Sequence, residues 1–189
     1  MLVVQDIFMI TKNLNPNQII TLNDYPLHSD TVLNRYFIKC NIGGNVPLVP
    51  VIKKETVKKY FDYALLKKFK QFEGQNPKAE YFMLDGSHRT TALTLNGCKI
   101  KVIIYRNGKD IREARKLVKT GQVLENDTLN RSLEENSKIL NRHFTKKPYF
   151  MTVEQKTIKM VVKKILPKKI INSYRNIVKS ATIVNDINS

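Results

Sequence analysis

Hydrophobic positions in the first 105 residues switch repeatedly between the two periods that strands and helices require. An apolar run with β-branched members predicts a buried strand over residues 2–10, and the Asn- and Pro-containing stretch 13–17 predicts a turn. Apolar side chains then recur at helical spacing after Ser29 or Asp30, either of which can be the N-cap. The Gly-Gly pair at 43–44 predicts the end of this helix.

Two further apolar segments follow. Residues 46–52 predict a short strand. Its two prolines predict either an edge position or a loop-like start, because proline cannot donate to a ladder. Residues 55–72 predict a helix, and 73–78 predict a loop. The side chains that this helix is expected to bury are Val57, Tyr60, Phe61, Ala64, Leu65, Phe69 and Phe72.

The next stretch, 81–105, has the clearest pattern. It predicts a strand over 81–84, a turn, a helix over 87–95 and a second strand over 99–105. Strands and helices therefore alternate along residues 1–105, which indicates an α/β or α+β domain.

Residues 106–189 are predicted to form a basic helical region, either as a domain of its own or as helices that pack against the first sheet. Two capping boxes, Ser132–Glu135 and Thr152–Gln155, mark helix starts, and Pro167 ends the second helix. Residues 146–150 are expected to be a linker. Further expectations are a helix over 109–119, an amphipathic segment through Ile170, Ile171, Tyr174, Ile177 and Val178, and frayed residues at the end of the chain.

The composition narrows the class of protein. The chain has 189 residues, 42% of them hydrophobic, which suffices for one core and is too apolar for a disordered chain. No apolar run is long enough to span a membrane, and the N-terminus lacks the basic region of a signal peptide. We therefore expect a cytoplasmic protein with no membrane partner. Cys40 and Cys98 form no disulfide framework, which agrees with a reducing compartment.

The charge is strongly positive and uneven. The 33 Lys+Arg against 16 Asp+Glu give a net charge of +17, with 14 basic and 8 acidic residues in 1–105 and 19 and 8 in 106–189. Such a surface attracts polyanions, whereas the excess of Lys over Arg, 25 to 8, equally fits a compositional bias. If the second half binds DNA, lysines are expected to contact its phosphates: Lys156, Lys159, Lys163, Lys164, Lys168 and Lys169.

One segment, Asp-Gly-Ser-His-Arg-Thr at 85–90, carries candidate chemistry. A strand runs into a turn and a new helix there, and the first N–H groups of a helix bind anions because they lack internal partners. Asp85 is placed to hold Mg²⁺ or to accept a proton. The residues expected to bind the phosphates of a nucleotide are Gly86, Ser87, His88, Arg89 and Thr90.

These residues also have structural interpretations. Ser87 can be a plain N-cap, and Asp85 can stabilise the turn. His88 can be a packed or solvated histidine, and Arg89 can make a surface ion pair.

Residues 81–105 resemble the signature of the ParB/sulfiredoxin superfamily: a strand, Asp-Gly-x-His-Arg, a helix with Ala, Leu-x-Gly-Cys and a strand. The helix that ends in Gly and the Pro-containing strand 46–52 resemble its N-terminal half, so the likeness covers residues 1–105. The resemblance implies a small mixed sheet with helices, in which the N-terminus of helix 87–95 binds nucleotide phosphates.

The branches of that superfamily differ at the motif. Sulfiredoxins have a cysteine nucleophile where this chain has Ser87, and ParB partition proteins have an Arg-rich motif followed by a helix-turn-helix domain. The nearest pattern is the Asp-Gly-His-His-Arg of free serine kinases, with Ser87 replacing the first His. That branch uses an acidic residue near the first helix as a base, and Asp30 is the acid best placed for this role.

Three functions stay open. The first is binding of a nucleoside di- or triphosphate (ATP, ADP or CTP) with Mg²⁺ at Asp85. Asp85, His88 and Asp30 would then catalyse hydrolysis or phosphoryl transfer, as in an NTPase or small-molecule kinase. The alternative is a ParB-like DNA-binding regulator, partition protein or nuclease that uses the basic second half. The third is binding of nucleotide or protein without turnover. The oligomeric state stays open, a homodimer included.

Overall fold

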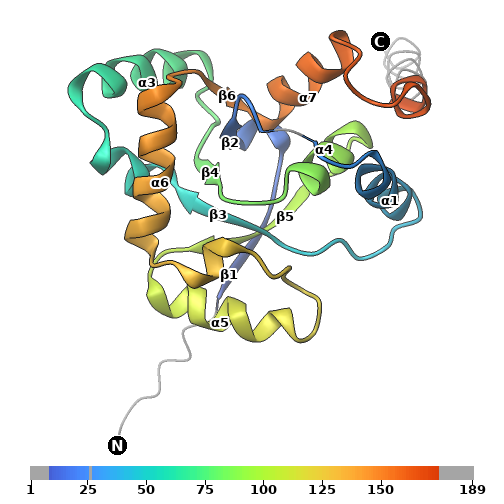
Figure 1. Ribbon diagram of the computed structural model, residues 1–189, viewed down its shortest axis with the longest axis horizontal. Helices are drawn as coiled ribbons and strands as arrows, with labels where there is room; N and C mark the ends of the chain where they lie inside the picture. The colour runs from blue at the N-terminus through green and yellow to red at the C-terminus, as the bar shows by residue number, and fades with distance from the viewer. Residues whose placement is uncertain (1–8, 26, 175–189) are drawn as a thin grey trace, which may run out of the picture.

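The chain has an α+β fold built on a mixed open sheet (Figure 1). The computed structural model describes residues 9–25 and 27–174. In this part of the chain the strands lie in the order β1-β5-β3-β4-β2-β6; β5 and β3 pair in parallel, as do β4 and β2, and the other neighbours are antiparallel. The strands are β1 (Ile10–Leu14), β2 (Ile19–Leu22), β3 (Val49–Lys53), β4 (Tyr81–Met83), β5 (Ile100–Tyr105) and β6 (Phe150–Thr152).

Helices cover both faces of this sheet. The helices on one face are α2 (Lys54–Val57), α3 (Tyr63–Gln75), α5 (Gly108–Val118) and α6 (Leu133–Lys146). The other face carries α1 (Asp30–Asn41), α4 (Ser87–Leu95) and α7 (Val153–Val162), which share an apolar cluster with residues 166–171. Short 3₁₀ turns are η1 (Pro16–Gln18), η2 (Lys58–Tyr60) and η3 (Asp127–Asn130).

Several local predictions are confirmed. Ser29 caps α1 by accepting from Val32 N, and the helix ends at the glycine pair 43–44. Helix α4 has the predicted bounds, and both predicted capping boxes form at the starts of α6 and α7. These features depend on hydrogen bonds between residues a few positions apart, so the local sequence is sufficient to determine them.

Other predictions are wrong. The edge position predicted for the strand within 46–52 is wrong, because β3 lies inside the sheet, where Pro50 contributes a carbonyl that accepts from Leu84 N (3.0 Å). The alternative of a loop-like start is confirmed, since residues 46 and 47 have no regular structure and β3 begins at Val49. The helix predicted over 55–72 is broken at Phe61, and Asp62 caps the new helix α3. Tertiary contacts of the Phe61 ring with the core outweigh the continuous apolar period of this segment.

The strands that the sequence missed are β2 and β6. Residues 146–150 were predicted as a linker, but Phe150 begins β6, which pairs with β2. In the predicted strand 2–10, residues 2–8 lie outside the described residues, and β1 begins at Ile10. Ile177, Val178 and the last residues also lie outside the described part. Helix α7 ends at Val162, before Pro167, because Lys164 adopts a left-handed φ of 54°.

The basic second half packs onto the first half through the same sheet and core. Strand β6 pairs with β2, and Phe144 of α6 lies 5.5 Å from Phe82 of β4 between ring centroids. Residues 106–174 therefore complete the sheet and contribute helices to both of its faces.

Buried Asp110 gives a pH-dependent prediction. Its carboxylate accepts hydrogen bonds from the backbone N, the Nε and the Nη2 of Arg106, at distances of 2.8–3.0 Å. Burial raises the pKa of Asp110, but these hydrogen bonds outweigh burial and hold it below its ordinary value of 3.8. The stabilisation is thus present above that value and is lost as the pH falls through the lower pKa of the folded state.

Asp110→Asn is therefore expected to cost about 1–3 kcal/mol of unfolding free energy at neutral pH, with the difference from the parent shrinking as the solution is acidified below about pH 4. Urea unfolding across this pH range measures it. Asp127→Asn, at an exposed ion pair with Arg131, is the control and should be nearly neutral. An equal loss at both positions would contradict this account.

Candidate phosphate site

The turn at Gly86 leaves the N-terminus of α4 open. Gly86 is the N-cap residue, has a φ of 114° and cannot cap the helix with a side chain. Within the described residues, the first bonded amide of α4 is Thr90 N, which donates to Gly86 O (2.9 Å). The preceding N–H groups of Ser87 and His88 are therefore available to an anion at the positive end of the helix dipole.

The turn is held by buried Arg89, whose side chain is 2% exposed. Its guanidinium donates to Asp85 Oδ2 (2.6 Å), Leu48 O (2.6 Å) and Pro47 O (3.3 Å), so it ties α4 to the beginning of β3. Burial lowers the pKa of Arg89, and the adjacent Asp85 opposes that shift. The arginine predicted as a phosphate ligand is thus turned inward and does not line the pocket beside the turn.

His88 joins the N-termini of α1 and α4. Ser29 N donates to His88 Nε2 (3.3 Å), which requires an unprotonated nitrogen there and a neutral ring with its proton on Nδ1. Burial lowers the pKa of His88, nearby His28 adds to the shift, and Asp85 opposes it. The Nδ1 atom lies 3.4 Å from Ser87 Oγ.

The remaining predicted ligand, Thr90, is fully buried. Its hydroxyl donates to Gly86 O (3.0 Å), one turn back in its own helix. Thr90 thus supports the turn, and the predicted phosphate ligands that line the pocket are Gly86 and Ser87.

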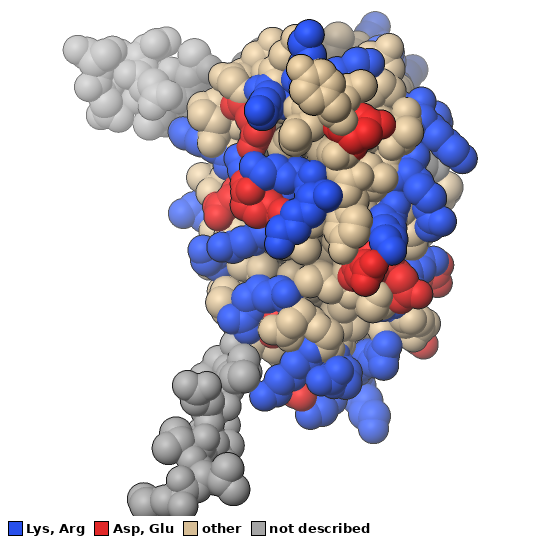
Figure 2. All heavy atoms as spheres, turned by 90° about the vertical axis from the view of Figure 1, so that its left-hand side faces the viewer, with Lys and Arg blue, Asp and Glu red and all other residues tan. Residues whose placement is uncertain are grey.

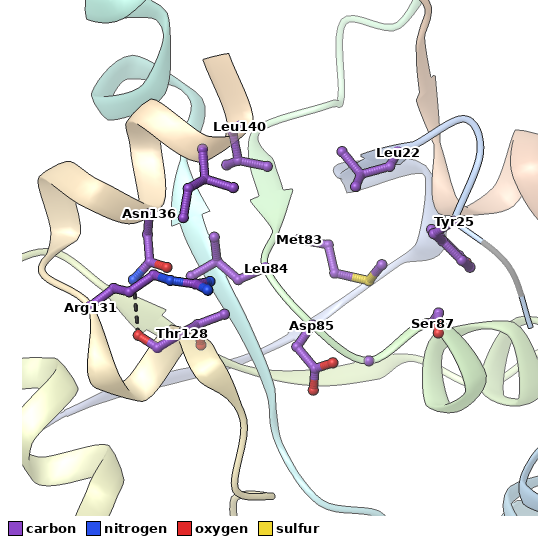
Figure 3. A pocket seen from close by; sticks show the side chains of 12 residues that line it. Leu22, Tyr25, Met83, Leu84, Asp85, Ser87, Thr128, Arg131, Asn136 and Leu140 are labelled. Carbon is purple, nitrogen blue, oxygen red and sulfur yellow. Dashed lines mark hydrogen bonds between the residues drawn. The ribbon is translucent and has the colours of Figure 1, made fainter. Parts of the chain in front are cut away.

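A pocket of about 180 Å³ lies in front of this turn (Figure 3). The turn supplies Asp85, Gly86 and Ser87, and the opposite wall supplies Arg131 from the segment before α6. The remaining lining residues are Leu22, Tyr25, Met83, Leu84, Thr128, Asn136, Ile139 and Leu140.

The opposite wall is ordered by hydrogen bonds. Asn136 Nδ2 donates to Thr128 O (2.9 Å), which fixes α6 against η3. Arg131 is partly exposed, and its Nη2 atom lies 3.1 Å from Asp127 Oδ2 in an ion pair. The pocket therefore places a partly exposed cation, Arg131, opposite the open helix N-terminus.

The loop 23–25 forms another side of the pocket and is anchored to the second half of the chain. Tyr25 Oη lies 3.3 Å from Thr91 Oγ1, and Lys156 Nζ lies 5.0 Å from the Tyr25 ring centroid. Lys156 also donates to Asn23 O, and Lys159 donates to Asn23 Oδ1 (2.8 Å). These two predicted DNA contacts are thus used inside the molecule, and Lys156 is only 7% exposed.

The other predicted residues lie apart from the pocket. Asp30 lines a separate surface hollow with Pro167 and Lys169, so the structure does not bring its carboxylate together with Asp85. Lys163, Lys164, Lys168 and Lys169 are exposed. On the face shown in Figure 2, Lys and Arg are dispersed and interrupted by Asp and Glu, with no single continuous basic patch.

The donor set for a metal ion is small. The described residues contain no cluster of three or more His, Cys, Asp or Glu side chains suited to a metal. Asp85 is the one carboxylate that lines the pocket, and only one of its oxygens is bonded to Arg89. Such a site fits Mg²⁺ only where a ligand's phosphates supply further oxygens.

Comparisons with known proteins returned nothing: a scan of family profiles, a search of curated proteins and a search of solved structures each found no match to this chain. No helix among the described residues is both long enough and apolar enough to cross a bilayer.

Sequence reasoning missed the wall formed by Arg131, Asn136 and Tyr25. These residues are far from the 85–90 motif in sequence, and no short motif connects them to it. The only nearby signal is the capping box at Ser132, which predicts that a helix starts beside Arg131.

Proposed function

We propose that this protein binds a nucleoside di- or triphosphate through its phosphates, in the pocket in front of Gly86. The open N-terminus of α4, facing Arg131 across the pocket, carries this proposal. The N–H groups of Ser87 and His88 would bind one phosphate, as free helix N-termini do. Arg131 would bind a second anionic group as a fork of donors.

The pocket size limits how a nucleotide can bind. A volume of about 180 Å³ is below the roughly 300–1,000 Å³ of typical small-molecule sites. The phosphates and the adjoining part of the sugar would lie inside, next to the apolar side chains Leu22, Met83 and Leu140, and the base would lie outside. Mg²⁺ would be held by Asp85 together with the phosphates and would neutralise their charge.

Phosphoryl transfer is the further step of this proposal. Because Asp30 lies elsewhere and Asp85 is paired with Arg89, the chain's contribution would be positioning and charge stabilisation, which dominate this type of reaction. The competing proposal is binding without turnover. Release of inorganic phosphate from ATP, CTP or GTP with Mg²⁺ distinguishes the two.

Ser87→Asp separates ligand binding from folding. A carboxylate at the first position of α4 would repel phosphate, yet negative charge is tolerated at a helix N-terminus. We expect nucleotide affinity to fall at least about tenfold while the unfolding free energy stays within about 1 kcal/mol of the parent. Isothermal titration and urea unfolding measure the two quantities.

Asn13→Asp, which makes the same charge change at an exposed site on edge strand β1, is the matched control and should leave the affinity unchanged. The proposal would be overturned by a Ser87→Asp variant that binds nucleotide as tightly as the parent. Failure of ATP, ADP, CTP and GTP to raise the melting temperature of the parent, with or without Mg²⁺, would also exclude it.

A further inference from the structure

The end of α7 exposes a group of aliphatic side chains. Ile158 and Val162, one helical turn apart, are 47% and 73% exposed, and Ile165, just beyond the helix, is 62% exposed. Their neighbours Met160, Val161 and Leu166 are buried in the cluster shared with α1 and α4. One side of this segment is therefore packed against α1 and α4. Ile158, Val162 and Ile165 are additional apolar side chains that are exposed to solvent.

The segment that carries this surface is strongly positive. Residues 155–174 contain six lysines and no acidic residue, and the acidic residue of α7 is Glu154, one turn before Ile158. Lys156 and Lys159 are bound to Asn23, whereas the remaining four are exposed and make no ion pair with the described residues. We name the α7 surface as Ile158, Val162, Ile165, Lys163, Lys164, Lys168 and Lys169.

The combination of exposed lysines and exposed aliphatic side chains favours one kind of partner over others. A nucleic acid backbone would satisfy the lysines but would gain nothing from the three exposed aliphatic side chains. A folded protein partner needs about 800 Å² of complementary surface on each side, far more than three aliphatic side chains provide. An anionic bilayer attracts lysines at its headgroups and buries apolar side chains just below them, without requiring shape complementarity.

We propose that the α7 surface binds peripherally to anionic lipid bilayers, with Ile158, Val162 and Ile165 entering the headgroup region and the four lysines contacting lipid phosphates and carboxylates. The surface lies on the other side of the sheet from α3, α5 and α6 (Figure 1). This inference stands independently of the phosphate pocket.

Co-sedimentation of the full chain with vesicles tests it. Binding is expected to vesicles of equal parts phosphatidylserine and phosphatidylcholine, to weaken as salt is raised, and to be absent with phosphatidylcholine alone. Replacing Ile158, Val162 and Ile165 together by serine should weaken binding about tenfold. The matched control is Ile38→Ser with Ile42→Ser, which removes exposed aliphatic side chains at and just after the end of α1 and should leave binding unchanged.

The charge contribution is tested in the same way. Changing the four lysines of the α7 surface to glutamine should weaken binding by about fivefold per lysine. The control changes four exposed lysines on and after α3 to glutamine, with the same loss of charge: Lys67, Lys68, Lys70 and Lys78. Unfolding midpoints establish that each variant is folded.

The proposal is overturned if the parent chain does not bind the anionic vesicles, or if the control variants lose as much binding as the α7 variants. It is also overturned if the triple serine variant binds vesicles like the parent, since the aliphatic residues would then have no part. Binding to duplex DNA without binding to vesicles would identify the surface as a nucleic acid site and contradict the proposal.

Discussion

Arg89→Ala is expected to lower the free energy of unfolding by about 3–5 kcal/mol, because it removes a buried cation and leaves three acceptors without their donor. The carbonyls of Pro47 and Leu48 and the Asp85 carboxylate all depend on this guanidinium. Urea unfolding monitored by circular dichroism measures the loss.

Arg131→Ala is the control for Arg89. Among the described residues, partly exposed Arg131 pairs with exposed Asp127, so its removal should cost less than about 1 kcal/mol. Arg89→Lys should recover only part of the loss, since one ammonium group cannot reproduce a planar fork that serves three acceptors. A stable Arg89→Ala variant that has lost nucleotide affinity would instead make Arg89 a direct phosphate ligand and contradict its structural role.

Phe144→Ala is expected to cost a similar amount, about 3–5 kcal/mol. The Phe144 ring is fully buried, stacks on Phe150 with centroids 4.5 Å apart and contacts Phe82 of the central sheet. Because these rings come from both halves of the chain, the variant should lower the stability of the whole protein in one cooperative transition.

The control for Phe144 is Tyr149→Ala, which removes an aromatic side chain that is 66% exposed and should change the unfolding free energy by less than about 0.5 kcal/mol. Two separate unfolding transitions, with only the second affected by Phe144→Ala, would mean that residues 106–174 fold independently. That result would contradict the shared core.

Local structure was largely predictable from the sequence. The N-cap at Ser29 and the capping boxes at Ser132 and Thr152 follow from side chains that bond to backbone groups three residues away, and α4 begins directly after the glycine turn at Gly86. The alternation of apolar segments also sufficed for the α+β class.

Strand pairing was less predictable. The position of Pro50 inside the sheet depends on which of its backbone groups face a neighbouring strand, and β6 forms because β2 offers an unpaired edge. The break at Phe61 depends on aromatic partners from β4, α3 and α6. Each of these outcomes is set by residues distant in sequence, which periodicity does not detect.

By itself, the sequence determined that residues 85–90 join a strand to a helix through a glycine turn, because Gly86 and the surrounding pattern permit little else. Only the tertiary structure decided what the side chains of that segment do. A buried arginine must satisfy its donors, so Arg89 turns toward Asp85 and the carbonyls of Pro47 and Leu48 just before β3, and a distant arginine, Arg131, comes to face the open helix end. The same long-range packing decides which lysines of the basic second half are bound internally and which remain at the surface.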